Sequence, residues 1–222
     1  SQYNFKDPMT VGKHWMEIQK LFLYLNYKLF FKTHNCYFDR FGNKFCNSLT
    51  TKAAVYIIRD PRDVVCSYMD WMKEEENKIL DFILKSNYTM FPSKDHFVPF
   101  TYIGNWEENI KSWELSFAEI KLKIIRYEDL YNNTHDIFKE ILLFLSEFID
   151  IKIDPRKIDE VIEDSKLDKL KILEKDGNFI ENTGKNIFFN KGGTRFRSQL
   201  SDNLISKINS EFESTMKKYN YL

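Results

Sequence analysis

The chain has little glycine, proline and cysteine, and its formal net charge is zero. The glycines and prolines, seven and five among 222 residues, form no linker-like stretch, so a single domain over residues 1–222 with a substantial core is expected. Basic and acidic residues are equal in number at 33 each. This balance provides no general field for nucleic acid, so DNA or RNA binding is not expected, and an anion site must come from local clustering.

Cysteines and long apolar runs are also scarce. The three cysteines, an odd number, indicate reduced thiols in a cytosol-like compartment, and their spacing is not that of metal ligands. We therefore expect a cytoplasmic protein without a metal. The longest apolar runs, such as Ile141–Leu145, are too short to cross a bilayer, so no membrane span is expected, although a missing N-terminal segment could have carried an anchor.

The most informative stretch joins an apolar segment to a polar one. Ala53–Ile58 is apolar and β-branched, which predicts a buried strand, and Pro61 suits the first position of a helix that Asp60 can cap. Arg59 is then at the carboxyl end of a strand, where open α/β sheets bind ligands, and Ser67 follows about two helical turns later. A phosphate could bridge the two side chains. Alternatively, Arg59 forms a surface ion pair with a neighbouring aspartate.

Two other apolar segments are also followed directly by polar or charged residues. Lys28–Phe31 predicts a strand that ends in Lys32–His34, and Leu122–Arg126 predicts another that runs into Tyr127–Leu130. Near the end of the chain comes Phe188–Gly193. In order and spacing, these segments and the R-x-P-x-D-x-x-x-S stretch resemble the sulfotransferases that use 3′-phosphoadenosine 5′-phosphosulfate (PAPS). The resemblance implies a three-layer α/β fold of the P-loop nucleotide-hydrolase type, with a mostly parallel sheet flanked by helices.

The resemblance also implies roles for individual residues. His34 corresponds to the general base, Arg59 and Ser67 to the pair that holds the 3′-phosphate, and Tyr127 to the adenine contact. On its own, His34 reads as a packing histidine at a strand end, and its K-T-H context favours the catalytic interpretation. A neutral imidazole near pH 7 suits a base. Lys32 is on the same face of an extended strand and can touch the sulfonate as charge develops.

The family's glycine-containing loop near the C-terminus is matched only in part. Lys191 and Gly192 align with it, whereas Asn190 replaces an arginine. The phosphate contact at that position is then neutral, unless Arg195 or Arg197 takes it over. Phe196 stands in place of a tryptophan.

Two further segments depart from the family. Ser165 begins a stretch similar to the family's adenine segment, although Leu167 replaces the usual aromatic residue. Nothing over Ser1–Gln19 resembles the family's first strand and phosphate-cradling loop. We expect the chain to lack that segment, or to be a naturally truncated, inactive homologue.

The predicted activity is transfer of a sulfonate from PAPS to a hydroxyl, or as second choice an amine, of a small-molecule or glycan acceptor, with 3′-phosphoadenosine 5′-phosphate (PAP) as product. The rivals are a P-loop kinase and a non-catalytic nucleotide-binding relic. The residues of the K-T-H-N and R-D-P-R-D stretches look like those of bacterial sequences, which predicts a bacterial source. Apolar spacing predicts helices over residues 12–26, 62–76, 106–119, 134–148, 155–164 and 202–219. Residues 81–102 show no sustained period, so they are expected to be irregular, either as a lid over the acceptor site or as a small satellite core.

Overall fold

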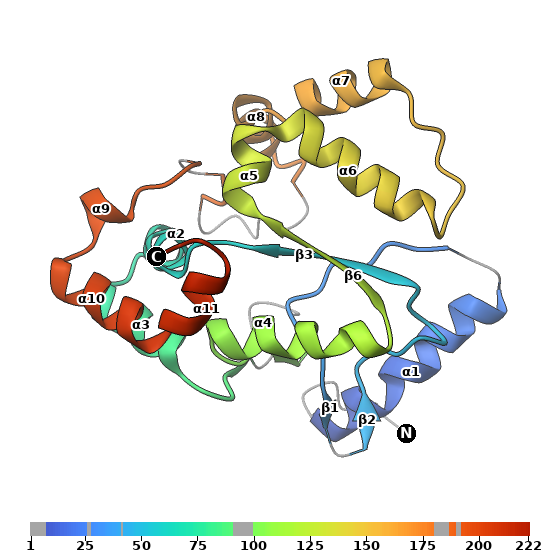
Figure 1. The fold of residues 1–222 in the computed structure, drawn as a ribbon, viewed down its shortest axis with the longest axis horizontal. Helices are drawn as coiled ribbons and strands as arrows, with labels where there is room; N and C mark the ends of the chain where they lie inside the picture. Colours follow the sequence, from blue (N-terminus) through green and yellow to red (C-terminus); the bar gives the residue numbers. More distant parts are fainter. Residues whose placement is uncertain (1–7, 26–27, 41, 91–99, 180–186, 190–191) are drawn as a thin grey trace. The chain divides into compact units, whose positions relative to one another are not determined.

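The fold is built on two neighbouring parallel strands. The structure is a computed structural model, and it describes residues 8–25, 28–40, 42–90, 100–179, 187–189 and 192–222. Strands β3 (Ala53–Ile58) and β6 (Lys121–Arg126) are hydrogen-bonded neighbours, and both arrows point the same way in Figure 1. Helices follow both carboxyl ends, so the predicted α/β class is confirmed, as are the strands predicted over 53–58 and 122–126.

The chain divides into two compact units, and it passes from one to the other within both strands. The first unit contains residues 1–56 and 85–123, and the second contains residues 57–84 and 124–222. The carboxyl ends of β3 and β6, together with the helices that follow them, therefore belong to the second unit.

The first unit is organised around aromatic side chains. Its elements are α1 (Pro8–Tyr24), β1 (Asp39–Arg40), β2 (Asn43–Lys44), β4 (Thr89–Met90), β5 (Thr101–Tyr102), α4 (Trp106–Leu115) and the 3₁₀ turn η1 (Ser116–Ala118). The Trp15 ring meets Phe38 and Phe45 edge to face, at centroid distances of 5.3 and 5.5 Å. Such pairs stabilise a core beyond the burial of their area. Asn105 begins α4 with a capping box, which satisfies otherwise unpaired amides of the first turn.

The second unit is mainly helical. Its helices are α2 (Pro61–Met72), α3 (Glu76–Leu84), α5 (Tyr127–Asn132), α6 (Thr134–Ser146), α7 (Pro155–Asp164), α8 (Leu167–Lys175), α9 (Phe196–Gln199), α10 (Asp202–Glu211) and α11 (Glu213–Lys218). Helix α10 packs against both α2 and α3 (Figure 1). Val65, Ile79 and Ile208 are at most 2% exposed, which places the core of this unit between these helices.

Each segment predicted as a helix contains a helix in the structure, most of them with shifted ends. The prediction differs from the structure in several places. Helices α3, α5, α8 and α9 were not expected. Residues 81–84 belong to α3, and residues 89–90 and 101–102 form the paired strands β4 and β5, whereas residues 91–99 of the predicted irregular segment lie outside the described part. The last predicted helix is two helices, because Phe212 leaves helical geometry with φ −110° and ψ 20°.

The strand predicted over Lys28–Phe31 is also wrong, because these residues are irregular in the structure. The side chains of Leu29, Phe30 and Phe31 are 48%, 75% and 67% exposed. A strand needs a neighbour to pair with its backbone groups, and within the described ranges no strand pairs with this segment. Apolar composition alone therefore does not make it a strand.

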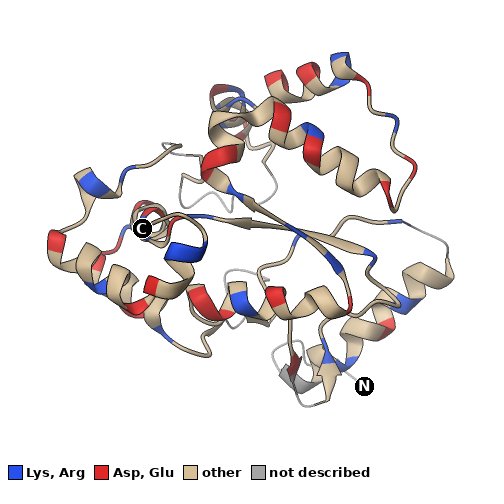
Figure 2. Cartoon of the chain, in the orientation of Figure 1, with Lys and Arg blue, Asp and Glu red and all other residues tan. Residues whose placement is uncertain are grey.

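Charged residues of both signs are spread over the helices, as Figure 2 shows, which agrees with the balanced composition. In the described part of the chain, no helix combines the length and apolar character needed to cross a membrane.

Candidate functional site

The junction between β3 and α2 has the predicted capping geometry. Asp60 is the N-cap of α2, and its carboxylate accepts a hydrogen bond of 2.9 Å from the backbone N–H of Arg62. Pro61 occupies the first turn, where its missing N–H leaves no backbone group unsatisfied. This cap fixes the direction in which the chain leaves the strand, and so the position of the preceding residue, Arg59.

The partner of Asp60 is Arg62 rather than Arg59. The two side chains are 7% and 8% exposed, and their charged atoms approach to 2.6 Å. The Arg62 guanidinium also donates to the Tyr221 carbonyl at 2.7 Å and to Asn209 Oδ1 at 3.1 Å. The surface ion pair considered for Arg59 and Asp60 is thus replaced by a buried pair that holds the strand end against the C-terminal residues.

Arg59 instead joins three segments that are far apart in sequence. Its guanidinium lies 4.4 Å above the centre of the Tyr127 ring, and its Nη2 donates to the Gly193 carbonyl at 3.0 Å. Tyr127 begins α5 directly after β6. Gly193 belongs to the loop that contains Gly192 and Gly193, called the glycine loop below. The structure therefore brings the predicted phosphate-binding arginine, the predicted adenine contact and the predicted loop into one cluster.

Next to this cluster is a small cavity of about 210 Å³. Its walls come from both turns of α5 and from the glycine loop, and the residues that line it are Tyr127, Glu128, Tyr131, Asn132, Gly193 and Thr194. It combines the rings of Tyr127 and Tyr131 with backbone of the loop, which suits a flat ring, and the one charged side chain in its lining is Glu128. This cavity is the candidate nucleotide site of the second unit.

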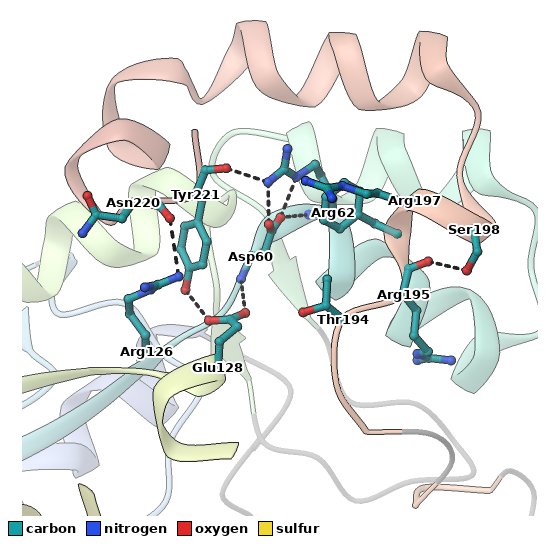
Figure 3. A pocket seen from close by; sticks show the side chains of 11 residues that line it. Asp60, Arg62, Arg126, Glu128, Thr194, Arg195, Arg197, Ser198, Asn220 and Tyr221 are labelled. Carbon is teal, nitrogen blue, oxygen red and sulfur yellow. Dashed lines mark hydrogen bonds and ion pairs between the residues drawn. The ribbon is translucent and has the colours of Figure 1, made fainter. Parts of the chain in front are cut away.

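A larger open cavity of about 520 Å³ shares Glu128 and Thr194 with the first (Figure 3). Arginines line it, namely Arg62, Arg126, Arg195 and Arg197. Most of this charge is balanced, since Arg62 pairs with Asp60, Arg126 is 3.6 Å from Asp129, and Arg195 is 2.6 Å from Asp70. The second cavity is therefore less basic than its arginine content suggests.

Glu128 connects the ends of the two central strands. One of its oxygens accepts the backbone N–H of Asp60 at 3.1 Å, and the other accepts the Tyr221 hydroxyl at 3.0 Å (Figure 3). Burial first, and then the negative charge of Glu128, raise the pKa of Tyr221 well above its ordinary value. The tyrosine stays protonated and keeps donating to Glu128 throughout the neutral range.

Asp63 fixes the segment that follows the glycine loop. Its Oδ1 accepts the backbone N–H groups of Arg195 and Phe196, at 2.6 and 3.0 Å. Phe196 is 5% exposed and lies under the Arg62 guanidinium at 4.1 Å. Arg195 is thus held on α2 by Asp63 and Asp70, whereas Arg197 is exposed.

The predicted catalytic residues belong to the first unit. Lys32 and His34 are exposed and lie just after the irregular segment 28–31. The His34 carbonyl accepts a hydrogen bond of 3.2 Å from Asn109 Nδ2, and Asn109 also accepts from the Tyr56 hydroxyl at 3.0 Å. Asn35, next in the chain, is buried and accepts from the Tyr102 N–H at 2.8 Å. The backbone on one side of His34 is therefore well fixed.

The remaining predicted residues are more scattered. Ser67 is half-buried in α2, and Ser165 is exposed at the end of α7, where its hydroxyl donates to the Ile162 carbonyl. Neither is among the residues that line the two cavities described above. Lys191, with Asn190, lies outside the described residues, whereas Gly192 contacts the cluster through Tyr131.

Several residues of the site were missed in the sequence. The carboxylates Asp63 and Glu128 lie inside the recognised motifs, but their partners come from distant segments that no local pattern identifies. Asn109 gave no signal, because a single asparagine in an amphipathic helix is unremarkable. Tyr131 could have been found, since it follows Tyr127 at the four-residue spacing that brings side chains together on a helix.

Comparison with known proteins adds independent information. The family model described as the sulfotransferase domain matches residues 17–220. Sulfotransferase 2A6 of Rattus norvegicus is 33% identical over 131 residues, which cover 57% of this chain and 42% of the rat protein. The match thus spans less than half the length of this curated relative.

Among solved structures, the crystal structure of mouse sulfotransferase SULT7A1 complexed with PAP is similar, with a TM-score of 0.56 and 18% identity. The match covers 74% of this chain and 58% of the mouse chain, and it supports a common fold. Both relatives are mammalian, so a bacterial source for the present chain stays a prediction.

Proposed function

This chain belongs to the sulfotransferase family, and we propose that it transfers a sulfonate group from PAPS to the hydroxyl of an organic acceptor, with an amine as the second choice. The observation that carries the proposal is the cluster of Arg59, Tyr127 and Gly193, because three segments with nucleotide-binding resemblance converge there. PAPS supplies an activated sulfonate, and the chemistry resembles phosphoryl transfer, in which the protein positions the reactants and neutralises charge.

The cluster fits the 3′-phosphate of such a donor. A guanidinium has five N–H donors in a planar fork, so one arginine can serve the Gly193 carbonyl and a phosphate together. The Tyr127 ring holds the guanidinium plane from one side. Ser67, Lys191, Arg195 and Arg197 are proposed as further contacts by resemblance, and Ser165 as a contact near the adenine.

His34 is proposed to accept the proton of the attacking hydroxyl, and Lys32 to stabilise charge on the transferred group. Both side chains are exposed, and the Asn109 hydrogen bond fixes the His34 backbone. A positioned base of this kind contributes about 10²- to 10⁴-fold to the rate. The acceptor hydroxyl loses its proton to the imidazole as its oxygen bonds to sulfur, and the bridging oxygen leaves with PAP.

A thermal-shift titration with PAP tests the nucleotide assignment. A ligand that binds only the folded chain raises the unfolding midpoint with its concentration. We expect PAP to do so for the wild type, Arg59→Ala to weaken the effect, and Arg156→Ala, an exposed arginine on α7, to preserve it. The absence of a shift with PAP would refute the assignment, and a shift with ATP alone would favour the kinase.

A sulfotransfer assay with PAPS and a panel of phenols, alcohols and amines tests the catalytic part. His34→Ala should abolish turnover and leave the PAP-induced shift nearly intact. His14→Ala is the matched control, because His14 pairs with Glu17 on α1 and has no proposed role. Equal turnover by His34→Ala and the wild type would rule out the base.

A further inference from the structure

Tyr131 is placed where α5 faces the glycine loop. Its ring stacks on Tyr127 with 5.9 Å between centroids and 28° between planes, and it lines the smaller cavity. It is 52% exposed, which is unusual for a large aromatic residue that serves only a core. Its position one helical turn after Tyr127 extends the stack that begins with the Arg59 guanidinium.

Gly192 lies directly against this ring. A Cβ atom at Gly192 would be 2.8 Å from Cε2 of Tyr131 and 3.4 Å from Cζ. Carbon atoms do not approach to 2.8 Å without a shift of one partner, since the attractive optimum is about 3.5–4.0 Å. The absence of a side chain at Gly192 is therefore what allows the loop backbone to pack on Tyr131.

The neighbouring Gly193 is held by a different interaction. Its φ of +78° is in the region that favours glycine, and its carbonyl accepts from Arg59 at 3.0 Å. The loop is thus fixed at consecutive residues, at Gly192 by an aromatic surface and at Gly193 by a guanidinium. Arg59, Tyr127 and Tyr131 are themselves stacked, so both contacts belong to one continuous support.

We propose that Tyr131 is a positioning residue, which holds the Gly192–Gly193 backbone in the conformation that receives the 3′-phosphate of the donor nucleotide. The inference rests on the proposed function, because it concerns the same nucleotide site. A loop that is ordered before binding costs less entropy when the ligand arrives, which increases affinity. The contribution of Tyr131 comes from its ring, so phenylalanine should replace it.

Calorimetric titration with PAP tests this role in a double-mutant cycle. Tyr131→Ala and Gly192→Ala should each weaken binding by about tenfold to a hundredfold, as expected when a binding group is misplaced. The double variant should bind no more weakly than the worse single variant, because both changes remove the same contact. Tyr131→Phe should bind like the wild type, and so should Tyr24→Ala, which removes a tyrosine that is 87% exposed.

Kinetics provide a readout that a general loss of stability does not produce. With Tyr131→Ala, the KM for PAPS should rise while the KM for the acceptor is unchanged, and Tyr131→Phe should restore the wild-type values. Unfolding midpoints measured without nucleotide show whether each variant folds. If Tyr131→Ala does not fold, Tyr131→Leu is used in its place. Leucine keeps apolar bulk but not the flat ring.

The outcomes separate the two proposals. If the wild type binds PAP and Tyr131→Ala binds it equally well, the positioning role is refuted and the nucleotide site stands. Additive losses in the double variant also refute it, since they mean that the two residues act independently. If the wild type does not bind PAP, the proposed function itself fails, and this role fails with it.

Discussion

Removal of the Arg62 guanidinium should destabilise the second unit strongly. Arg62 is 8% exposed on its side chain and pairs at 2.6 Å with Asp60, which is equally buried. In Arg62→Ala, the Asp60 carboxylate loses its partner in a site that water reaches poorly, and the carbonyl of Tyr221 loses a donor at 2.7 Å. The loss of one partner therefore leaves an uncompensated buried charge, which is more damaging than the loss of a contact.

The size of the effect follows from comparable buried pairs. Breaking one by removing a single partner costs about 3–5 kcal/mol in the free energy of unfolding. A chain of this size changes its unfolding midpoint by about 2–4 °C for each kcal/mol, so we expect a drop of about 6–20 °C. Lys78→Ala is the matched control, because the pair of Lys78 with Glu74 is exposed and such pairs are worth about 0–1 kcal/mol.

Thermal and urea unfolding, followed by circular dichroism, measure the difference. The double variant Asp60→Asn/Arg62→Met should lose less stability than the two single changes add up to, because it leaves no buried charge and asparagine can still cap the helix. A drop for Arg62→Ala no larger than that for Lys78→Ala would refute the reasoning.

Three other predictions follow from the structure. Asn105→Ala removes the capping box of α4 and should lower the free energy of unfolding by about 0.5–2 kcal/mol in urea titrations, and an unchanged midpoint would contradict this. Burial raises the pKa of Cys36 from 9.0 to about 12, and the pKa of Cys46 and Cys66 from 9.0 to about 11. A thiol reagent at pH 8 should therefore label the unfolded chain and spare the folded one. Because the unfolded thiols ionise first, stability should also fall as the pH rises from 9 through 11, and a constant unfolding midpoint over that range would contradict this. Asn109→Ala removes the Asn109 hydrogen bond to the carbonyl of the proposed base, His34, and should lower kcat with little change in the KM for PAPS, whereas an unchanged kcat would separate Asn109 from catalysis.

The parts of the fold that the sequence predicted well are those whose causes are local. The strand over 53–58 and the helix after Pro61 were recognisable because an apolar run, a capping aspartate and a proline stand in the right order. The segment 28–31 looked like a strand for the same reason of composition, and it is irregular because no described strand pairs with it. Pairing is a non-local property, which a single segment does not encode.

The residues of the candidate site also fall into those that the sequence identified and those that it did not. The resemblance identified Arg59 and Tyr127, and the structure brings them within 4.4 Å of each other. It did not identify the residues that support them, because Glu128 and Asp63 obtain their roles from partners at Tyr221 and at the segment after the glycine loop. These long-range hydrogen bonds become visible only when the chain is folded.

The central claim is that the Arg59 cluster recognises the 3′-phosphate of the donor nucleotide. Calorimetric titration of the wild type and of Arg59→Ala with PAP and with 5′-AMP, which lacks that phosphate, tests it most directly. We predict that the wild type prefers PAP and that Arg59→Ala loses the preference while it still folds. Equal affinity of the wild type for both nucleotides, or a preference that survives in Arg59→Ala, would contradict the account.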